Sequence, residues 1–138
     1  MAARIDAYVD TSAFIAFMDA SDTYHALFRR LFSAPPGIVL TTSLVIAEGH
    51  GWFLRRCDRT RALQFLGMVD DMPVLDVRSV GPTERRGATS LLRRFGDQDL
   101  TLADAVGLHL MQDEGAASCW STDRHLGLVG TPLAIHSV

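Results

Sequence analysis

The amino-acid sequence predicts an α/β fold built around a buried parallel sheet. Short apolar runs alternate with segments of helical periodicity, which is the pattern of strands joined by covering helices. The chain has 138 residues, enough for a single domain spanning 1–138 with one hydrophobic core. A hydrophobic content of 48% and a charged content of 21% are typical of globular proteins and exclude a disordered chain.

The first half of the chain predicts two strands, each followed by helices. The apolar run at about 5–10 precedes a helix from Thr11 to Asp19. A second helix is predicted at about 22–33, where apolar residues recur at helical spacing. The run 38–41 (IVLT) is the second strand, and Thr42 or Ser43 caps the helix after it.

The second half continues the alternation. Helices at about 59–69 and 82–95 flank a short strand at 74–77 (VLDV), and Pro82 suits the first turn of its helix. A helix at 101–113 precedes a strand at 117–122, and a last strand is predicted near 133–136.

Nothing in the sequence indicates a membrane or secreted protein. No apolar run approaches the roughly 20 residues that a membrane-spanning helix needs. Acidic residues interrupt the N-terminal MAARIDAYVD, so we expect no signal peptide. Cys57 and Cys119 are the only cysteines, too few for a disulfide scaffold, so we expect a cytoplasmic location.

The net charge of −3 argues at first against a nucleic-acid partner, because phosphate binding depends on cationic side chains. All 13 cationic side chains are arginines, however, and many are adjacent: Arg29 with Arg30, Arg55 with Arg56, Arg85 with Arg86, and Arg93 with Arg94. Acids gathered at one site would lower the total charge and leave arginine-rich surfaces free to hold phosphates. Each pair can equally be the solvated face of a helix.

Four acidic residues stand where a carboxylate is unexpected. Asp10 and Asp123 each end an apolar run, so both are predicted at the carboxyl ends of parallel strands, where functional groups gather. Asp104 lies in the nearly all-apolar segment LTLADAVGLHLM, and Glu48 interrupts the apolar stripe of its helix. Ionised carboxylates are rare in apolar surroundings without a compensating partner. The four therefore indicate a shared divalent cation.

Structural roles are the alternative for three of the four. Asp10 and Asp123 can each cap the segment that follows. Thr101 and Asp104 fit the S/T-x-x-D/E capping pattern. Glu48 is harder to explain in this way, because positions 44, 45, 48 and 52 share one helical face and a merely solvated glutamate belongs on the opposite face.

The chemistry of the four side chains favours Mg²⁺ or Mn²⁺. Several carboxylates in one pocket repel one another, and without a cation one or more takes up a proton near neutral pH. Hard oxygen ligands suit Mg²⁺ and Mn²⁺. The histidines are scattered and no HExxH or CxxC spacing occurs, which argues against zinc.

The segments around these acids resemble PIN-domain ribonucleases, in particular VapC-type toxins of bacterial toxin–antitoxin pairs. The resemblance covers essentially the whole chain and is carried by YVDTSAF at 8–14, TSLVIAEGHGWF at 42–53, DQDLTLADAVGLHLM at 97–111 and STDRHL at 121–126. It implies a PIN-like three-layer α/β/α sandwich with a central parallel sheet, and Mg²⁺- or Mn²⁺-dependent endoribonuclease activity. The family often has asparagine or threonine before the glutamate, where this chain has Ala47.

The resemblance also implies a role for each residue of the acidic site. It assigns metal ligation to Asp10 and Asp104, with Glu48 and Asp123 completing the catalytic set. Polar neighbours are expected to support these ligands: Thr11, Ser12, Thr122 and either Asp97 or Asp99. Arg124, beside Asp123, is expected to hold a substrate phosphate, and an exposed position in solvent explains it equally well.

The implied reaction is hydrolysis of single-stranded RNA. The ions would bind a phosphate oxygen and lower the pKa of water, which attacks phosphorus in line and leaves 5′-phosphate and 3′-hydroxyl ends. The resemblance further implies a cognate antitoxin protein and a homodimer. The alternative is a catalytically silent PIN-like scaffold that acts through partner binding, and metal binding without RNA cleavage would favour it.

Overall fold

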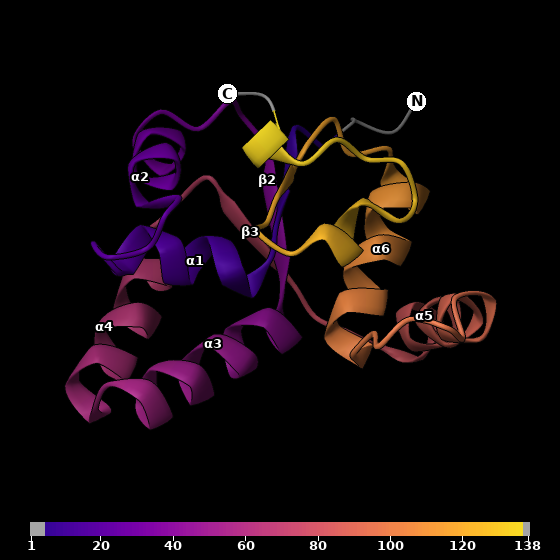
Figure 1. Cartoon of the computed structure of the whole chain (residues 1–138), viewed down its shortest axis with the longest axis horizontal. Coiled ribbons are helices and arrows are strands. Elements are labelled where there is room, and N and C mark those ends of the chain that lie inside the picture. The colour runs from indigo at the N-terminus through magenta and orange to yellow at the C-terminus, as the bar shows by residue number, and fades with distance from the viewer. Residues whose placement is uncertain (1–4, 137–138) are drawn as a thin grey trace.

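The computed structural model describes residues 5–136 and places a four-stranded sheet between two layers of helices (Figure 1). We expected no signal peptide at the N-terminus, and its first four residues, 1–4, lie outside the described residues. All strands pair in parallel in the order β3-β2-β1-β4, which confirms the α/β prediction. The strands are β1 (Ala7–Val9), β2 (Val39–Thr42), β3 (Leu75–Arg78) and β4 (Cys119–Trp120).

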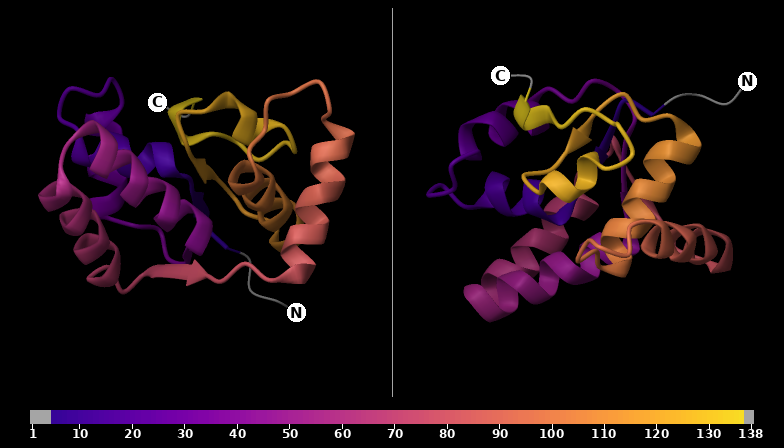
Figure 2. Two further views of the ribbon diagram at one scale, coloured as in Figure 1. Left: turned by 90° about the horizontal axis from the view of Figure 1, so that it is seen from below. Right: turned by 45° about the vertical axis from the view of Figure 1, so that its right-hand side comes forward.

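Within residues 5–136, six α-helices cover the two faces of the sheet, and all six were predicted. They form two groups, one on each face (Figures 1 and 2). The first group is α1 (Thr11–Met18), α2 (His25–Ser33), α3 (Ser43–Arg56) and α4 (Arg59–Asp70). The second group is α5 (Pro82–Arg94) and α6 (Leu102–Glu114).

Alternation along the central strand divides the core into two. In β1, Ala7 and Val9 pack into the core beneath α1 to α4, whereas Tyr8 between them packs beneath α5 and α6. All three residues are fully buried. A strand buried on both faces must be apolar throughout, so a carboxylate directly after it is conspicuous in the sequence.

The prediction of a last strand near 133–136 is wrong. Ala134–His136 form a short 3-10 helix, and Leu133 makes only an isolated parallel bridge with Cys119. Pro132 accepts a hydrogen bond from the Cys119 N–H at 2.8 Å. Directly after the bridge the His136 N–H donates to the Leu133 carbonyl at 3.0 Å, so the chain turns into the 3-10 helix and the pairing does not extend into a ladder.

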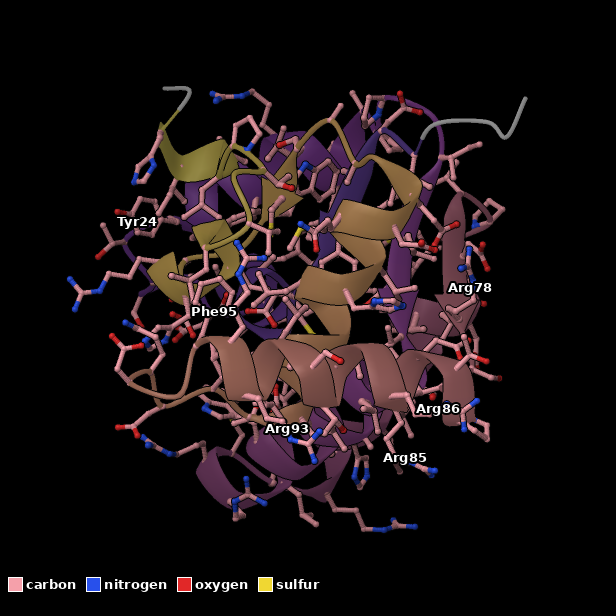
Figure 3. The ribbon with its side chains drawn as sticks, turned by 90° about the vertical axis from the view of Figure 1, so that its right-hand side faces the viewer. Tyr24, Arg78, Arg85, Arg86, Arg93 and Phe95 are labelled. Atoms are coloured by element: carbon pink, nitrogen blue, oxygen red, sulfur yellow. The ribbon has the colours of Figure 1, made fainter. Side chains whose placement is uncertain are left out.

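Arginines mark the side of the molecule formed by β3, α5 and α6 (Figure 3). Arg78, at the end of β3, donates two hydrogen bonds to Glu114 at 2.6 and 3.1 Å and so joins the edge strand to the end of α6. Arg85, Arg86 and Arg93 are exposed on α5. Among the described residues, no helix combines the length and the apolar character needed to cross a bilayer.

Two helical glycines lead to opposite predictions for stability. A Cβ added at Gly107 in α6 would lie 2.7 Å from the Tyr8 hydroxyl oxygen, whereas one added at Gly67 in α4 would meet nothing within 4 Å. We expect Gly107→Ala to lower the free energy of unfolding by about 1–3 kcal/mol through overpacking. The matched change Gly67→Ala should raise it by about 0.5–1 kcal/mol by restricting the unfolded chain. Thermal unfolding measures both changes. An unchanged free energy of unfolding in Gly107→Ala would contradict the close contact of α6 with β1.

Candidate active site

The four carboxylates singled out in the sequence line one pocket of about 260 Å³. Asp10 follows β1, Glu48 lies on α3, Asp104 lies in the first turn of α6, and Asp123 follows β4. The sheet register explains part of this convergence. Val9 pairs with Trp120 in parallel, so the residues that follow β1 and β4 emerge side by side at the carboxyl edge of the sheet.

Asp10 is the most deeply buried of the four, with 5% of its surface exposed. It occupies the N-cap position of α1, yet its side chain makes no capping hydrogen bond. Instead its Oδ2 accepts hydrogen bonds from the hydroxyls of Ser12 and Ser121, both at 3.0 Å. Burial, followed by repulsion from Asp104, raises the pKa of Asp10 to about 6, and the two serine hydroxyls oppose that rise.

Asp104 serves both as a cap and as a wall of the pocket. Its N–H donates to Thr101 Oγ1 at 3.1 Å, and its Oδ2 accepts from the Thr101 N–H at 3.2 Å, which completes the predicted capping box. Burial raises the pKa of Asp104, the hydrogen bonds to Thr101 oppose the rise, and the charge of Asp123 adds to it. The capping contacts fix the carboxylate at the start of α6 while it lines the pocket.

Asp123 lies across the pocket from α3 and is half-buried. Its Oδ1 accepts a hydrogen bond from the His125 N–H at 2.9 Å, and His125 Nδ1 lies 3.1 Å from the same oxygen. Asp123 thus caps the 3-10 helix Arg124–Gly127, as the structural alternative for this residue proposed. As with Asp104, the capping role and the place in the pocket coexist.

Glu48 lines the pocket, but the expectation that it interrupts a buried stripe is wrong. The glutamate is exposed, and the buried face of α3 consists of Val45, Gly49 and Phe53. A Cβ at Gly49 would lie 2.6 Å from the Phe65 ring, so close packing against α4 decides which face of α3 turns inward. Glu48 Oε1 accepts a hydrogen bond of 2.5 Å from the Thr11 hydroxyl, which holds the side chain at the rim of the pocket.

Ser121 connects the carboxylates that follow two strands, Asp10 and Asp123, and was missed by the sequence reasoning. It is fully buried, donates to Asp10 Oδ2, and accepts from the Asp123 N–H at 2.9 Å. Ser12 Oγ lies 3.1 Å from Ser121 Oγ and accepts from the Thr122 N–H at 2.9 Å. The strand register would have identified Ser121, because it follows Trp120 as Asp10 follows Val9.

Several expected helper residues lie outside the pocket. Thr122 contributes its backbone N–H to Ser12, and its hydroxyl does not line the pocket. Asp97 and Asp99 are exposed in the loop before α6. Arg124 lines a separate cavity that includes Leu128. Their roles stay predictions, whereas Thr11 and Ser12 both lie in the pocket wall.

The donor set suits a hard divalent cation that keeps part of its water shell. Within residues 5–136, no three Asp, Glu, His or Cys side chains are grouped closely enough to hold a metal ion by themselves. Mg²⁺ commonly takes one or two carboxylates directly and retains several waters, so Asp10 and Asp104 could hold it with water in the remaining positions. A cation there would offset the burial and the repulsion that raise the pKa values of both carboxyls.

Known proteins share this sequence pattern and this fold. The family model described as PIN domain matches residues 7–130. The 23S rRNA-specific endonuclease VapC20 of Mycobacterium tuberculosis is 26% identical over 123 residues, which cover 89% of this chain and 93% of that protein. The crystal structure of M. tuberculosis VapC20, a Sarcin-Ricin loop cleaving toxin, matches with a TM-score of 0.83 and 24% identity, covering 91% of this chain and 96% of that one. PAE2754 from Pyrobaculum aerophilum matches in fold with a TM-score of 0.64 and 18% identity, over 96% of this chain and 92% of that one.

Because the pKa of Asp10 is raised, we expect Asp10→Asn to increase the free energy of unfolding of the metal-free protein, by an amount that depends on pH. The folded state favours the protonated carboxyl, so its ionisation costs stability above the folded pKa of about 6 and costs nothing below the usual value of 3.8. In EDTA at pH 8, Asp10→Asn should raise the free energy of unfolding by roughly 2–3 kcal/mol, and the gain should vanish near pH 4. Urea unfolding measures the difference. Asp113→Asn, at an exposed position of α6, controls for the loss of one charge, and equal stabilities of Asp10→Asn and wild type at pH 8 would refute the account.

Proposed function

Since the chain belongs to the PIN domain family, we propose that it is an endoribonuclease that uses Mg²⁺ or Mn²⁺ to hydrolyse phosphodiester bonds of single-stranded RNA. The observation that carries the proposal is that four carboxylates from distant segments, Asp10, Glu48, Asp104 and Asp123, line one pocket. The similarity to VapC20, a 23S rRNA-specific endonuclease, supports RNA as the substrate. It also supports a role as the toxin of a toxin–antitoxin pair.

Asp10 and Asp104 are the proposed direct ligands, because they are the two buried carboxylates of the pocket and carry raised pKa values. When bound, the cation supplies positive charge to the phosphate and lowers the pKa of the attacking water. Ser12 and Ser121 fix the orientation of the Asp10 carboxylate, and Thr101 fixes that of Asp104. These contacts hold both carboxylates in place before substrate arrives.

Glu48 and Asp123 are proposed to orient the water that attacks phosphorus. Both lie in the pocket wall and are more exposed than Asp10 and Asp104, so each can reach water at the mouth. In-line attack then displaces the 3′ oxygen and leaves 5′-phosphate and 3′-hydroxyl ends. Since water is the nucleophile, the reaction needs neither a catalytic histidine nor the 2′-hydroxyl.

The resemblance to VapC-type toxins extends the proposal to partners. We propose a cognate antitoxin protein that neutralises the nuclease, and a homodimer as the working form, in the cytoplasm. A small reading frame directly upstream of this one would support the antitoxin.

A catalytically silent PIN-like scaffold is the second candidate. It is favoured by the spacing of the acidic side chains: no three of them within residues 5–136 are grouped closely enough to hold a metal ion alone, so a cation held there partly through water would not be fixed in place for catalysis. A scaffold of this kind would bind Mn²⁺ and a partner without cleaving RNA.

Removing either buried ligand should abolish RNA cleavage. We expect Asp10→Asn and Asp104→Asn each to lower the cleavage rate on the order of 10²–10³-fold or more, because each removes charge that stabilises the transition state. EDTA should have the same effect on the wild type. The rate is read from sequenced RNA ends, with Asp113→Asn as the matched control. Undiminished cleavage in EDTA, or by both variants, would rule out the metal-dependent mechanism.

Metal binding itself should stabilise the fold through the same side chains. A cation at about 100 times its dissociation constant should raise the free energy of unfolding by about 2.7 kcal/mol. Thermal unfolding with Mn²⁺ should show this shift in the wild type and little of it in Asp104→Asn. If both proteins shift equally, the ion binds outside the acidic pocket. If Mn²⁺ stabilises the wild type as expected but the protein leaves RNA uncleaved, the scaffold would be favoured.

A further inference from the structure

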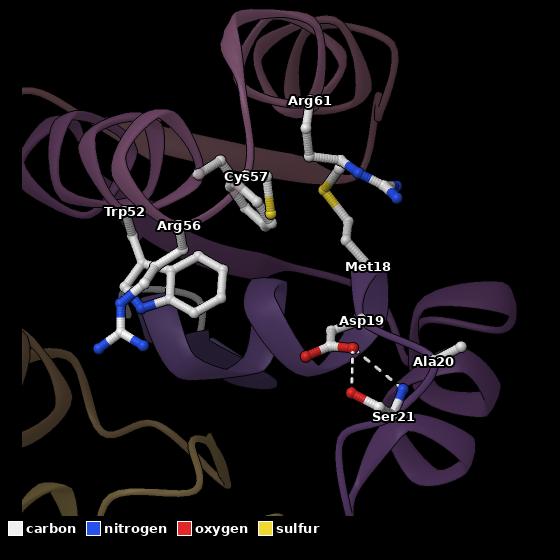
Figure 4. A pocket seen from close by; sticks show the side chains of 9 residues that line it. Met18, Asp19, Ala20, Ser21, Trp52, Arg56, Cys57 and Arg61 are labelled. Carbon is white, nitrogen blue, oxygen red and sulfur yellow. Dashed lines mark hydrogen bonds between the residues drawn. The ribbon is translucent and has the colours of Figure 1, made fainter.

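A second cavity, of about 630 Å³, adjoins the acidic pocket. It lies between the end of α1, the second half of α3 and the start of α4 (Figure 4). Trp52 lines both this cavity and the acidic pocket. Its volume is within the range of about 300–1,000 Å³ found for small-molecule sites. The acidic pocket, at about 260 Å³, is less than half as large. An RNA strand held at the carboxylates therefore has a roomier space directly beside it.

Glu48, Trp52 and Arg56 follow one another along one face of α3. They are four residues apart, so each step advances about 6 Å along the helix and stays on nearly the same side. Glu48 lines the acidic pocket, Trp52 lines both spaces, and Arg56 lines the second cavity. A strand leaving the carboxylates along α3 would meet first an aromatic ring and then a guanidinium group.

Trp52 is held in place and still borders open space. Its ring packs edge-on against Phe53 with centroids 5.1 Å apart, and the Arg56 guanidinium lies 5.9 Å from the ring centroid. The side chain is only partly buried, whereas Trp120, the other tryptophan, is 2% exposed and packs in the core. Such a ring offers a stacking surface to any nucleobase, and the neighbouring arginine can bind phosphate.

Two arginines, Arg56 and Arg61, and one carboxylate, Asp19, line the second cavity. Asp19 and Ser21 lie across it from Trp52 and Arg56 (Figure 4). Asp19 Oδ1 accepts hydrogen bonds from the Ser21 hydroxyl at 2.6 Å and the Ser21 N–H at 3.0 Å. These bonds lower the pKa of Asp19, and the charge of Arg61 adds to the lowering. No acidic group within residues 5–136 lies within 4.0 Å of the guanidinium nitrogens of Arg56. A phosphate is therefore attracted to Arg56, and a donor group of a base is attracted to Asp19.

We propose that the second cavity binds the nucleotide next to the cleaved phosphate of single-stranded RNA. The base stacks on Trp52, an adjoining phosphate is held by Arg56, and an exocyclic amino group of the base donates a hydrogen bond to Asp19. Cytosine carries this amino group at C4, where uracil carries a carbonyl oxygen that the Asp19 carboxylate would repel, so the subsite prefers cytosine to uracil. This inference rests on the proposed ribonuclease function and assigns specificity to it.

Binding of short RNAs without cleavage tests the subsite. Labelled CCCC and UUUU tetranucleotides differ at each base in the amino group, and their affinity is measured by fluorescence anisotropy in EDTA. The protein is the Asp104→Asn form, which lacks one pocket charge and is not expected to cleave. We expect CCCC to bind more tightly than UUUU, and Asp19→Asn to remove the difference.

Two further changes separate stacking from charge. Trp52→Ala should weaken binding of both RNAs by about 5- to 150-fold, the range for loss of one stacked base. Arg56→Gln should weaken both by about tenfold or more. Arg55→Gln, at an adjacent and exposed position that does not line the cavity, is the matched control and should bind as the parent does. Since Arg56 is also exposed, its change tests the subsite even if Trp52→Ala is unstable.

The outcomes separate the subsite from the nuclease proposal. Parental affinity in Arg56→Gln, or equal binding of CCCC and UUUU by the parent, would overturn the subsite even if the wild type cleaves RNA. The expected pattern of binding in a chain that cleaves no RNA would support the subsite and refute the nuclease. If these changes leave RNA binding intact and weaken a protein partner instead, the cavity is a protein-docking site and the inference is wrong.

Discussion

The electrostatic cost of two buried carboxylates is the constraint on which the rest of this structure depends. Asp10 is 5% exposed and Asp104 is 9% exposed, and burial together with repulsion from neighbouring carboxylates disfavours the ionised forms. The serine and threonine donors around them offset only part of that cost. A divalent cation bound as we propose would offset the remainder.

The parallel sheet brings these groups together. β1 and β4 end side by side, which places Asp10 next to Ser121 and close to Asp123, and the cap of α6 brings Asp104 to the same edge. In Asp104 the carboxylate stabilises the start of the helix and also lines the pocket, so capping does not remove it from the site. Glu48, on α3, links this edge to the second cavity through Trp52.

Strand-end acids were predictable from the sequence, because an apolar run that stops at an aspartate marks both the strand and the edge where it ends. The face of α3 that turns into the core could not be predicted from the sequence. Periodicity places Val45 and Glu48 on overlapping faces, and the contact of Gly49 with Phe65, which is distant in sequence, decides between them. The pairing of Ser121 with Asp10 required the strand register. The predicted last strand stops at a single bridge between Cys119 and Leu133, after which the chain turns into the 3-10 helix Ala134–His136. In each case the missing information was a contact between distant segments.

Anomalous diffraction from crystals grown with Mn²⁺ tests the central claim most directly. We predict one difference peak in the acidic pocket, at about 2.0–2.3 Å from a carboxylate oxygen of Asp10 and one of Asp104, with the remaining ligands water. A fully occupied Mn²⁺ elsewhere on the protein, with the acidic pocket empty, would contradict the account.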